Sequence, residues 1–165
     1  MVIYCTRCWK DNPAGSKVCS QCGAPLETDN GSFIGKLIQA LSHPEPMAVE
    51  RAAWVLGELK ASASVMPLVH LLQTSQDMGA LEKVVEALGK IGHSSVVEVL
   101  ASSVARWPLR VRIQVAEALR RIGGPNAEKT LRTMLKDSSS QVQEAANNAL
   151  KTLESATDNG GEYAR

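Results

Sequence analysis

The feature that most constrains this chain of 165 residues is a short pattern that recurs four times. In each copy a valine or alanine precedes a leucine, and another aliphatic residue follows three positions later. Successive copies are 32, 31 and 31 residues apart, with their central leucines at Leu56, Leu88, Leu119 and Leu150. A second set of apolar residues follows the first three leucines by 12 and 16 positions: Leu68/Leu72, Leu100/Val104 and Leu131/Leu135. A fixed period of this length is typical of stacked repeats.

The apolar residues inside each repeat have helical spacing. Val111, Val115, Leu119 and Ile122 illustrate it, because residues three and four positions apart share one face of a helix. Aromatic residues make up only 4% of the chain, whereas alanine, leucine and valine are plentiful, and this composition favours helices over a β-sandwich. The chain is therefore predicted to be mostly helical.

Residues with known preferences for helix ends divide each repeat into two helices. Pro46, Pro108 and Pro125 fit a first helical turn, where a missing N–H costs nothing. Ser64 and Asp77 can cap a helix through their side-chain oxygens. The pattern predicts a lone helix, three helical pairs and a closing helix, over residues 32–42, 46–60, 64–74, 78–91, 95–106, 109–122, 126–136 and 139–154.

One helical pair cannot bury its apolar face alone, whereas stacked pairs share a continuous core, so residues 32–154 are predicted to form an α-solenoid. The stretch from Val111 to Leu150 is similar to HEAT-like repeats, particularly the short kind found in phycobilin lyases. This resemblance implies an all-α, two-layer fold and says little about function, because the repeated residues are the ones that pack. Residues 155–165 are predicted to be a disordered tail.

All four cysteines lie within the first 22 residues in the pattern C-x2-C-x10-C-x2-C, as Cys5, Cys8, Cys19 and Cys22. Each C-x2-C pair can form a tight turn that directs two thiolates to one point, and two pairs supply four ligands for a tetrahedral Zn²⁺ ion. Four thiolates leave no open coordination position, so one structural zinc ion is predicted. The segment has little core of its own, and the ion should contribute about 10 kcal/mol to its folding.

Three alternatives to zinc involve the same cysteines. Two disulfides are disfavoured in a reducing compartment, and the chain shows no secretory signal. Four unrelated free thiols would rarely fall into two C-x2-C pairs. Iron in a rubredoxin-like site is the main rival metal, because a tetrahedron of thiolates can hold either ion.

The segment Tyr-Cys-Thr-Arg-Cys, the Asn-Pro-Ala-Gly-Ser stretch that starts at Asn12, and the segment Cys-Ser-Gln-Cys-Gly-Ala-Pro-Leu resemble the short zinc-ribbon module common at the termini of prokaryotic proteins. The resemblance covers residues 3–26 and departs at Trp9, where such modules often have glycine. It implies a structural zinc and a role in contacting protein or nucleic acid. We therefore expect a zinc ribbon over 1–26 and a linker over 27–31.

The net charge of +1 conceals an uneven distribution of charge. Residues 106–136 contain eight basic and two acidic residues, whereas 31–105 sum to −2 and 137–165 to −3. If the second helix of each pair lines the concave face, four cations make one end of that groove positive: Arg106, Lys129, Arg132 and Lys136. An acidic peptide or a phosphate backbone could bind there, although charged runs are often only solvated helix faces.

No catalytic motif is present. The sequence has no glycine-rich phosphate loop, no G-x-S-x-G elbow and no H-E-x-x-H pair. Deoxyhypusine hydroxylase resembles this array in its repeats, but its di-iron site depends on His-Glu pairs, and none of His43, His70 and His93 precedes a glutamate. His70, in the middle of a predicted helix on the groove face, is a candidate partner-binding residue. No enzymatic activity is predicted.

These observations predict a cytoplasmic, non-catalytic interaction or scaffold protein that binds a protein partner, of acidic character, in its concave groove. The first alternative is a nucleic-acid-binding module that uses the ribbon and the basic residues of 106–136. The second is a tetrapyrrole-handling protein like the phycobilin lyases. No apolar run approaches the roughly 18 residues that a membrane span needs, so no membrane partner is expected.

Overall fold

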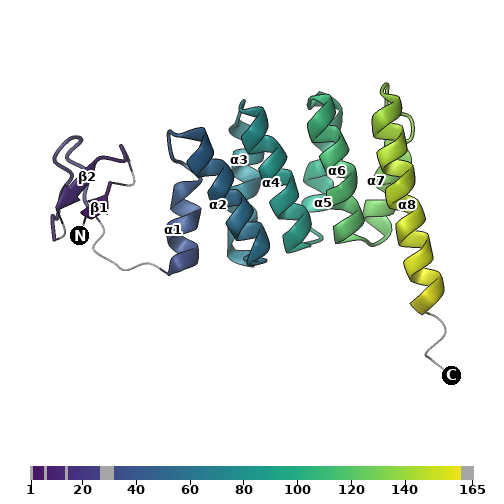
Figure 1. The fold of residues 1–165 in the computed structure, drawn as a ribbon, viewed down its shortest axis with the longest axis horizontal. Coiled ribbons are helices and arrows are strands. Elements are labelled where there is room, and N and C mark those ends of the chain that lie inside the picture. The colour runs from purple at the N-terminus through teal and green to yellow at the C-terminus, as the bar shows by residue number, and fades with distance from the viewer. Residues whose placement is uncertain (1, 6, 14, 27–31, 161–165) are drawn as a thin grey trace.

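The computed structural model describes residues 2–5, 7–13, 15–26 and 32–160, and the predicted linker over 27–31 lies outside them. A small two-stranded unit lies beside one end of a row of helices (Figure 1). Its strands β1 (Val2–Tyr4) and β2 (Asp11–Pro13) pair antiparallel. The described helices are α1 (Phe33–Ala40), α2 (Pro46–Glu58), α3 (Val65–Thr74), α4 (Met78–Ile91), α5 (Val96–Ser103), α6 (Leu109–Ile122), α7 (Pro125–Met134) and α8 (Ser140–Gly160), with 3-10 turns η1 (Ser62–Ser64) and η2 (Val104–Arg106).

The helix boundaries follow the residues that the sequence marks. Pro46 and Pro125 occupy the first positions of α2 and α7. The Asp77 carboxylate caps α4 by accepting the backbone N–H of Ala80 at 2.7 Å. The Ser64 hydroxyl does not cap α3 but donates to the carbonyl three residues earlier at 2.7 Å. Local chemistry therefore marks the starts of α2, α4 and α7.

The predicted end of the closing helix is wrong, whereas the other predicted helix ends lie within three residues of the observed ones. The closing helix does not stop at residue 154 but continues as α8 to Gly160, so residues 155–160 are helical, and residues 161–165 lie outside the described part. The added residues contain no proline, and their only glycine is the last, so nothing in them breaks the helix. Although α8 has 21 residues, no helix in the described part of the chain is both long and apolar enough to cross a membrane.

The helices form two layers, and this arrangement confirms the predicted α-solenoid. The even-numbered helices α2, α4, α6 and α8 pack side by side in one layer, α3, α5 and α7 lie behind them, and α1 packs against α2 at the N-terminal end of the row (Figure 1). The leucines of the repeat lie between the layers, with Leu56, Leu88 and Leu119 fully buried and Leu150 5% exposed. One continuous hydrophobic core runs through all the repeats.

Two glycines set the spacing inside the even-numbered layer. A Cβ atom added to Gly57 would lie 2.7 Å from the Cα atom of Ala87 in the next helix. A Cβ atom added to Gly89 would lie 2.7 Å from the Cα atom of Ala118. The backbones of α2 and α4, and of α4 and α6, therefore approach too closely for any side chain at these positions.

Candidate metal centre and binding groove

Two turns of matching geometry hold the four cysteines. The N–H groups of Cys5 and Cys19 donate to the carbonyls of Lys10 and Ala24, at 3.0 and 2.8 Å. We call residues 5–10 the first knuckle and residues 19–24 the second knuckle. Each knuckle presents two sulfur atoms on the same side, as the C-x2-C spacing predicts.

Trp9 and Gly23 occupy equivalent positions in the two knuckles. The Trp9 N–H donates to the Cys5 carbonyl at 2.8 Å, and the Gly23 N–H donates to the Cys19 carbonyl at 3.0 Å. Both residues have left-handed backbones, with φ of 60° at Trp9 and 68° at Gly23. This conformation costs a residue with a Cβ atom about 1–2 kcal/mol, so a tryptophan at this position does not stabilise the backbone of the knuckle.

The structure brings the four predicted ligands together. The sulfur atoms of Cys5 and Cys22, and those of Cys8 and Cys19, are 3.5 Å apart, and all four sulfurs lie within 4.8 Å of one another. In a tetrahedron with metal–sulfur bonds of about 2.3 Å, the sulfurs are about 3.8 Å apart. The four cysteines could therefore hold one metal ion.

The surroundings favour individual thiolates but not all four at once. The backbone N–H groups of Cys22 and Gln21 lower the pKa of Cys19 to about 6, although burial of its thiol acts in the opposite direction. The backbone N–H of Lys10 lowers the pKa of Cys8, but burial and its cysteine neighbours outweigh this effect and raise the pKa to about 12. Because clustered thiolates repel one another, full ionisation of this cluster requires a bound cation, and the donor set fits a metal.

Asn12 links the two halves of the ribbon and is only 2% exposed. Its side-chain oxygen accepts the N–H and the hydroxyl of Ser20 at 2.9 and 3.0 Å. Its amide nitrogen donates to the Lys10 carbonyl at 2.8 Å and to the Cys19 sulfur at 3.8 Å. From the sequence, Asn12 is identified only as part of the segment that resembles a zinc ribbon, because its contact with the second knuckle depends on the fold.

Replacing Asn12 with alanine is expected to weaken zinc binding about 10- to 100-fold, the usual effect of losing a group that orients a metal ligand. The measurement is a zinc competition titration against a chromophoric chelator. Gln21→Ala is the matched control, because this exposed side chain lies in the second knuckle beside Cys19 and the N–H that faces Cys19 is retained. Equal affinities of the Asn12→Ala and control variants would contradict the role of Asn12.

The first knuckle contacts the solenoid through Trp9. The Trp9 indole Nε1 donates to the carbonyl of Ser42 at 3.0 Å, in the turn between α1 and α2. The Trp9 and His43 rings meet edge to face, with their centroids 4.5 Å apart. His43 is itself held by the backbone N–H of Glu45, which donates to its Nδ1 at 3.0 Å. The ribbon therefore docks on the first turn of the array.

Five of the eight basic residues between 106 and 136 form ion pairs. Arg120 and Arg121 form ion pairs with Glu117 at 2.7 and 2.8 Å. The hydrogen bond from Arg120 has the largest effect on the pKa of Glu117, and together with the hydrogen bond from Arg121 it lowers this pKa to about 2. The other three basic residues pair with acidic residues from elsewhere in the chain: Arg110 with Glu82 at 3.2 Å, Arg112 with Asp137 at 3.0 Å, and Arg132 with Glu154 at 3.4 Å. Much of the positive charge is thus neutralised locally.

A groove of about 960 Å³ lies between α5 and α7 on the odd-numbered layer. Lys129 and Lys136 line it, and neither forms an ion pair within the described residues. Glu98 lines it from the α5 side. The apolar part of its lining comes from Val97, Ala101, Val104, Ala105 and Met134.

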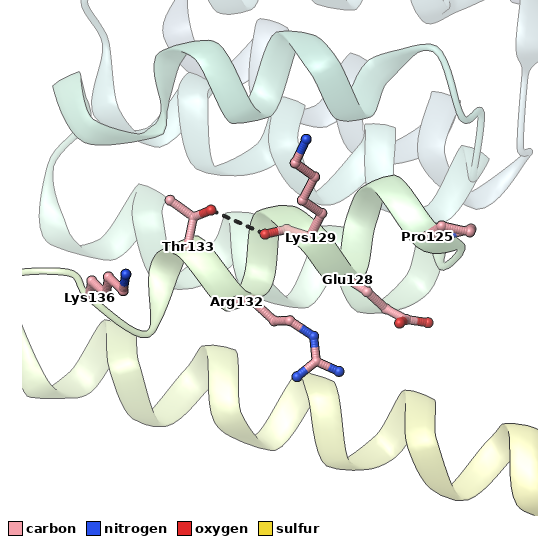
Figure 2. A pocket seen from close by; sticks show the side chains of 6 residues that line it. All are labelled: Pro125, Glu128, Lys129, Arg132, Thr133 and Lys136. Atoms are coloured by element: carbon pink, nitrogen blue, oxygen red, sulfur yellow. Dashed lines mark hydrogen bonds between the residues drawn. The ribbon is translucent and has the colours of Figure 1, made fainter.

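The structure brings three of the four predicted partner-binding cations together, because Lys129, Arg132 and Lys136 line a second depression beside α7. This depression has a volume of about 530 Å³, and in Figure 2 Arg132 extends toward α8 whereas Lys129 extends away from it. Arg106 donates to the Ser103 hydroxyl at 2.9 Å and, like Arg132, does not line the groove between α5 and α7. Of the four, only Lys129 and Lys136 line this groove, and a binding role for any of them stays a prediction.

His70 lies exposed on α3, outside the groove between α5 and α7. Its backbone carbonyl accepts the hydroxyl of Thr74 at 2.9 Å. The His70 side chain forms no hydrogen bond or ion pair with the residues that the structure describes, and its binding role also stays a prediction.

Comparison with known proteins supports the fold. Residues 34–110 match the family model of HEAT repeats. Two crystal structures of engineered proteins are similar in fold. The first has 24% sequence identity to this chain and a TM-score of 0.57, and the match covers 78% of this chain and 68% of the engineered protein. The second has 21% sequence identity and a TM-score of 0.56, and the match covers 75% of this chain and 64% of the engineered protein. No curated protein sequence matches the chain. At these identities the likeness concerns the fold alone.

Proposed function

We propose that this chain, whose residues 34–110 match the family model of HEAT repeats, is a non-catalytic interaction protein that binds a segment of a partner protein. HEAT arrays commonly act as scaffolds, because stacked helical pairs present an extended surface. The observation that carries the proposal is the groove between α5 and α7, where an apolar lining lies beside Lys129 and Lys136, two lysines without an ion pair among the described residues. Such a surface suits a partner segment that alternates apolar and acidic side chains.

The first test is affinity purification of the intact, zinc-replete chain, followed by mass spectrometry of the proteins it retains. The proposal expects one partner to be recovered reproducibly and to bind the purified chain directly. Failure to recover any reproducible partner would count against an interaction function.

Reversing the charge of both groove lysines, Lys129→Glu with Lys136→Glu, is expected to weaken binding of that partner at least about 10-fold, since two favourable charge contacts become repulsive. The measurement is a titration by isothermal calorimetry. The matched control is Lys36→Glu with Lys151→Glu, which changes the net charge equally at exposed positions on α1 and α8. Equal loss of affinity in both double variants would contradict a role for the groove.

Nucleic-acid binding is the alternative proposal, and it rests on the basic residues between 106 and 136 together with the ribbon. The ion pairs of Arg110, Arg112, Arg120, Arg121 and Arg132 reduce the charge available to phosphates. A gel-shift titration decides between the two proposals. Absence of binding at low salt, or binding unchanged by Arg120→Glu with Lys129→Glu, would remove the alternative.

A tetrapyrrole-handling role rests only on the sequence resemblance to phycobilin lyases. Mixing the chain with a bilin and recording its absorbance tests that role, and an unchanged spectrum would exclude it.

We further propose that the metal of the ribbon is one structural Zn²⁺ ion, held by Cys5, Cys8, Cys19 and Cys22. When bound, the ion would join the two knuckles and neutralise their thiolates, with no coordination position left for a substrate. All four cysteines are free thiols in the structure, which suits a reducing compartment and supports a cytoplasmic location. Elemental analysis of the purified chain tests the proposal, which expects one zinc per chain and no iron.

A further inference from the structure

We propose that metal binding determines where the ribbon sits on the solenoid, and that Trp9 is the residue that connects the two. The docking surface is the turn between α1 and α2, and its occupant is the Trp9 indole of the same chain. The inference rests on the proposed metal centre and adds to it a role in positioning the two modules.

The first knuckle determines the direction of the indole. Trp9 directly follows the ligand Cys8, and its backbone N–H closes the knuckle on the Cys5 carbonyl. Its left-handed backbone is maintained by this closed turn. When the two cysteines no longer share a metal, only these backbone hydrogen bonds oppose the cost of about 1–2 kcal/mol that this conformation has for a tryptophan, and the indole loses its fixed direction.

The surface that receives Trp9 is organised by the solenoid alone. The N–H groups of Ser42 and His43 donate to the carbonyls of Gln39 and Ala40 at the end of α1, each at 3.1 Å. These bonds fix the Ser42 carbonyl that accepts the indole N–H, and the N–H of Glu45 fixes the His43 ring. The docking surface is therefore already formed when the ribbon arrives.

The two modules do not share a hydrophobic core. In the described residues the ribbon buries Cys5, Cys19 and Leu26 in a small cluster of its own, separate from the cluster that fills the solenoid. The indole of Trp9 is thus a specific contact between two independently packed units, and its loss should release the ribbon without unfolding either unit.

The first experiment follows the indole N–H signals of the intact chain by NMR. Three tryptophans give three signals, which Trp→Phe variants assign. With zinc, the Trp9 indole N–H is expected to exchange with solvent at least ten times more slowly than after chelation, whereas the Trp54 and Trp107 signals stay unchanged. Exchange of the Trp9 signal that is independent of zinc would overturn the inference.

The second experiment separates docking from metal binding. Trp9→Gly provides the residue type that the second knuckle has at the equivalent position, so zinc affinity should be retained or increased while the indole is lost. In ¹⁵N relaxation measurements the zinc-loaded ribbon of this variant is expected to tumble faster than the solenoid, whereas in the wild-type chain the two tumble together. Gln21→Ala, in the second knuckle, is the control and should behave like the wild type.

A third variant, His43→Ala, leaves both knuckles intact and removes only the ring that faces Trp9, so an intermediate release of the ribbon is expected. Joint tumbling of ribbon and solenoid in zinc-loaded Trp9→Gly and His43→Ala would overturn the inference. Zinc content is measured on the same samples. A wild-type chain that takes up no zinc contradicts the proposed metal centre, and one that takes up zinc without protecting Trp9 contradicts only the docking role.

Discussion

Replacing Cys5 and Cys8 with serine is expected to unfold residues 3–26 and leave the helical array folded. The cysteines are themselves most of the ribbon's core, with Cys5 fully buried and Cys19 3% exposed. Small metal modules of this kind derive about 10 kcal/mol or more of apparent folding free energy from the ion, which exceeds what so small a cluster can supply. Chelation of the metal from the wild-type chain should have the same effect.

Hydrogen exchange by mass spectrometry measures this effect, since it reports the ribbon and the array separately. The amide hydrogens of Cys5, Cys19 and Gly23, bonded inside the knuckles, should lose protection, whereas those of α2 to α8 should keep it. Lys17→Ala, an exposed position between the cysteine pairs, is the control and should leave protection intact. A ribbon that stays protected without its ligands would contradict a metal-dependent fold.

Replacing Gly89 with alanine is expected to destabilise the array by about 1–3 kcal/mol, the range seen when a packed interface is overfilled. In an exposed helix the same change would stabilise by about 1 kcal/mol. Here the new methyl group would lie 2.7 Å from the Cα atom of Ala118, and backbone atoms cannot move aside singly, so α4 and α6 must separate. Chemical denaturation followed by circular dichroism measures the loss.

Gly79 provides the matched control for this prediction, because it lies in the first turn of the same helix. A Cβ atom there would meet the carboxylate end of the flexible Glu50 side chain, which can rotate away, and would lie 3.4 Å from the Asp77 carboxylate, an ordinary contact. Gly79→Ala should therefore leave stability unchanged or raise it by up to about 1 kcal/mol. A Gly89→Ala variant as stable as Gly79→Ala would show that the close approach of α4 and α6 does not constrain the array.

The helices were predictable because their boundaries are marked by local chemistry. Proline at the starts of α2 and α7 and the cap at Asp77 act over one turn, and the leucine period specifies which faces meet. The end of α8 was missed because the residues beyond 154 lack apolar periodicity without containing a helix breaker. The lack of an apolar pattern therefore does not indicate the end of a helix.

The binding surface was less predictable, because charge was summed along the sequence. Arg112 and Asp137 are 25 positions apart, and Arg132 and Glu154 are 22 apart, yet each pair is in contact, since adjacent repeats bring such positions together. A sum over residues 106–136 counts the arginines and omits these acidic partners.

The four cysteines were recognised from their spacing alone, whereas two residues that act with them were not. Asn12 and Trp9 make their decisive contacts with Ser20 and with the turn at Ser42, and those contacts exist only after the chain has folded. Tryptophan in a position that favours glycine was nevertheless a visible anomaly, and the structure supplies a reason for it.

The glycine contacts also determine which repeats could serve as building blocks. Gly57 and Gly89 permit near-contact of neighbouring helices, but one period later the corresponding residue is Arg120, which binds Glu117 and remains partly exposed. The repeat that contains Arg120 therefore cannot be copied into the middle of the array, because its arginine side chain would lie where adjacent helices contact each other through their backbones. An engineer who wished to lengthen this protein would duplicate the unit that contains Gly89.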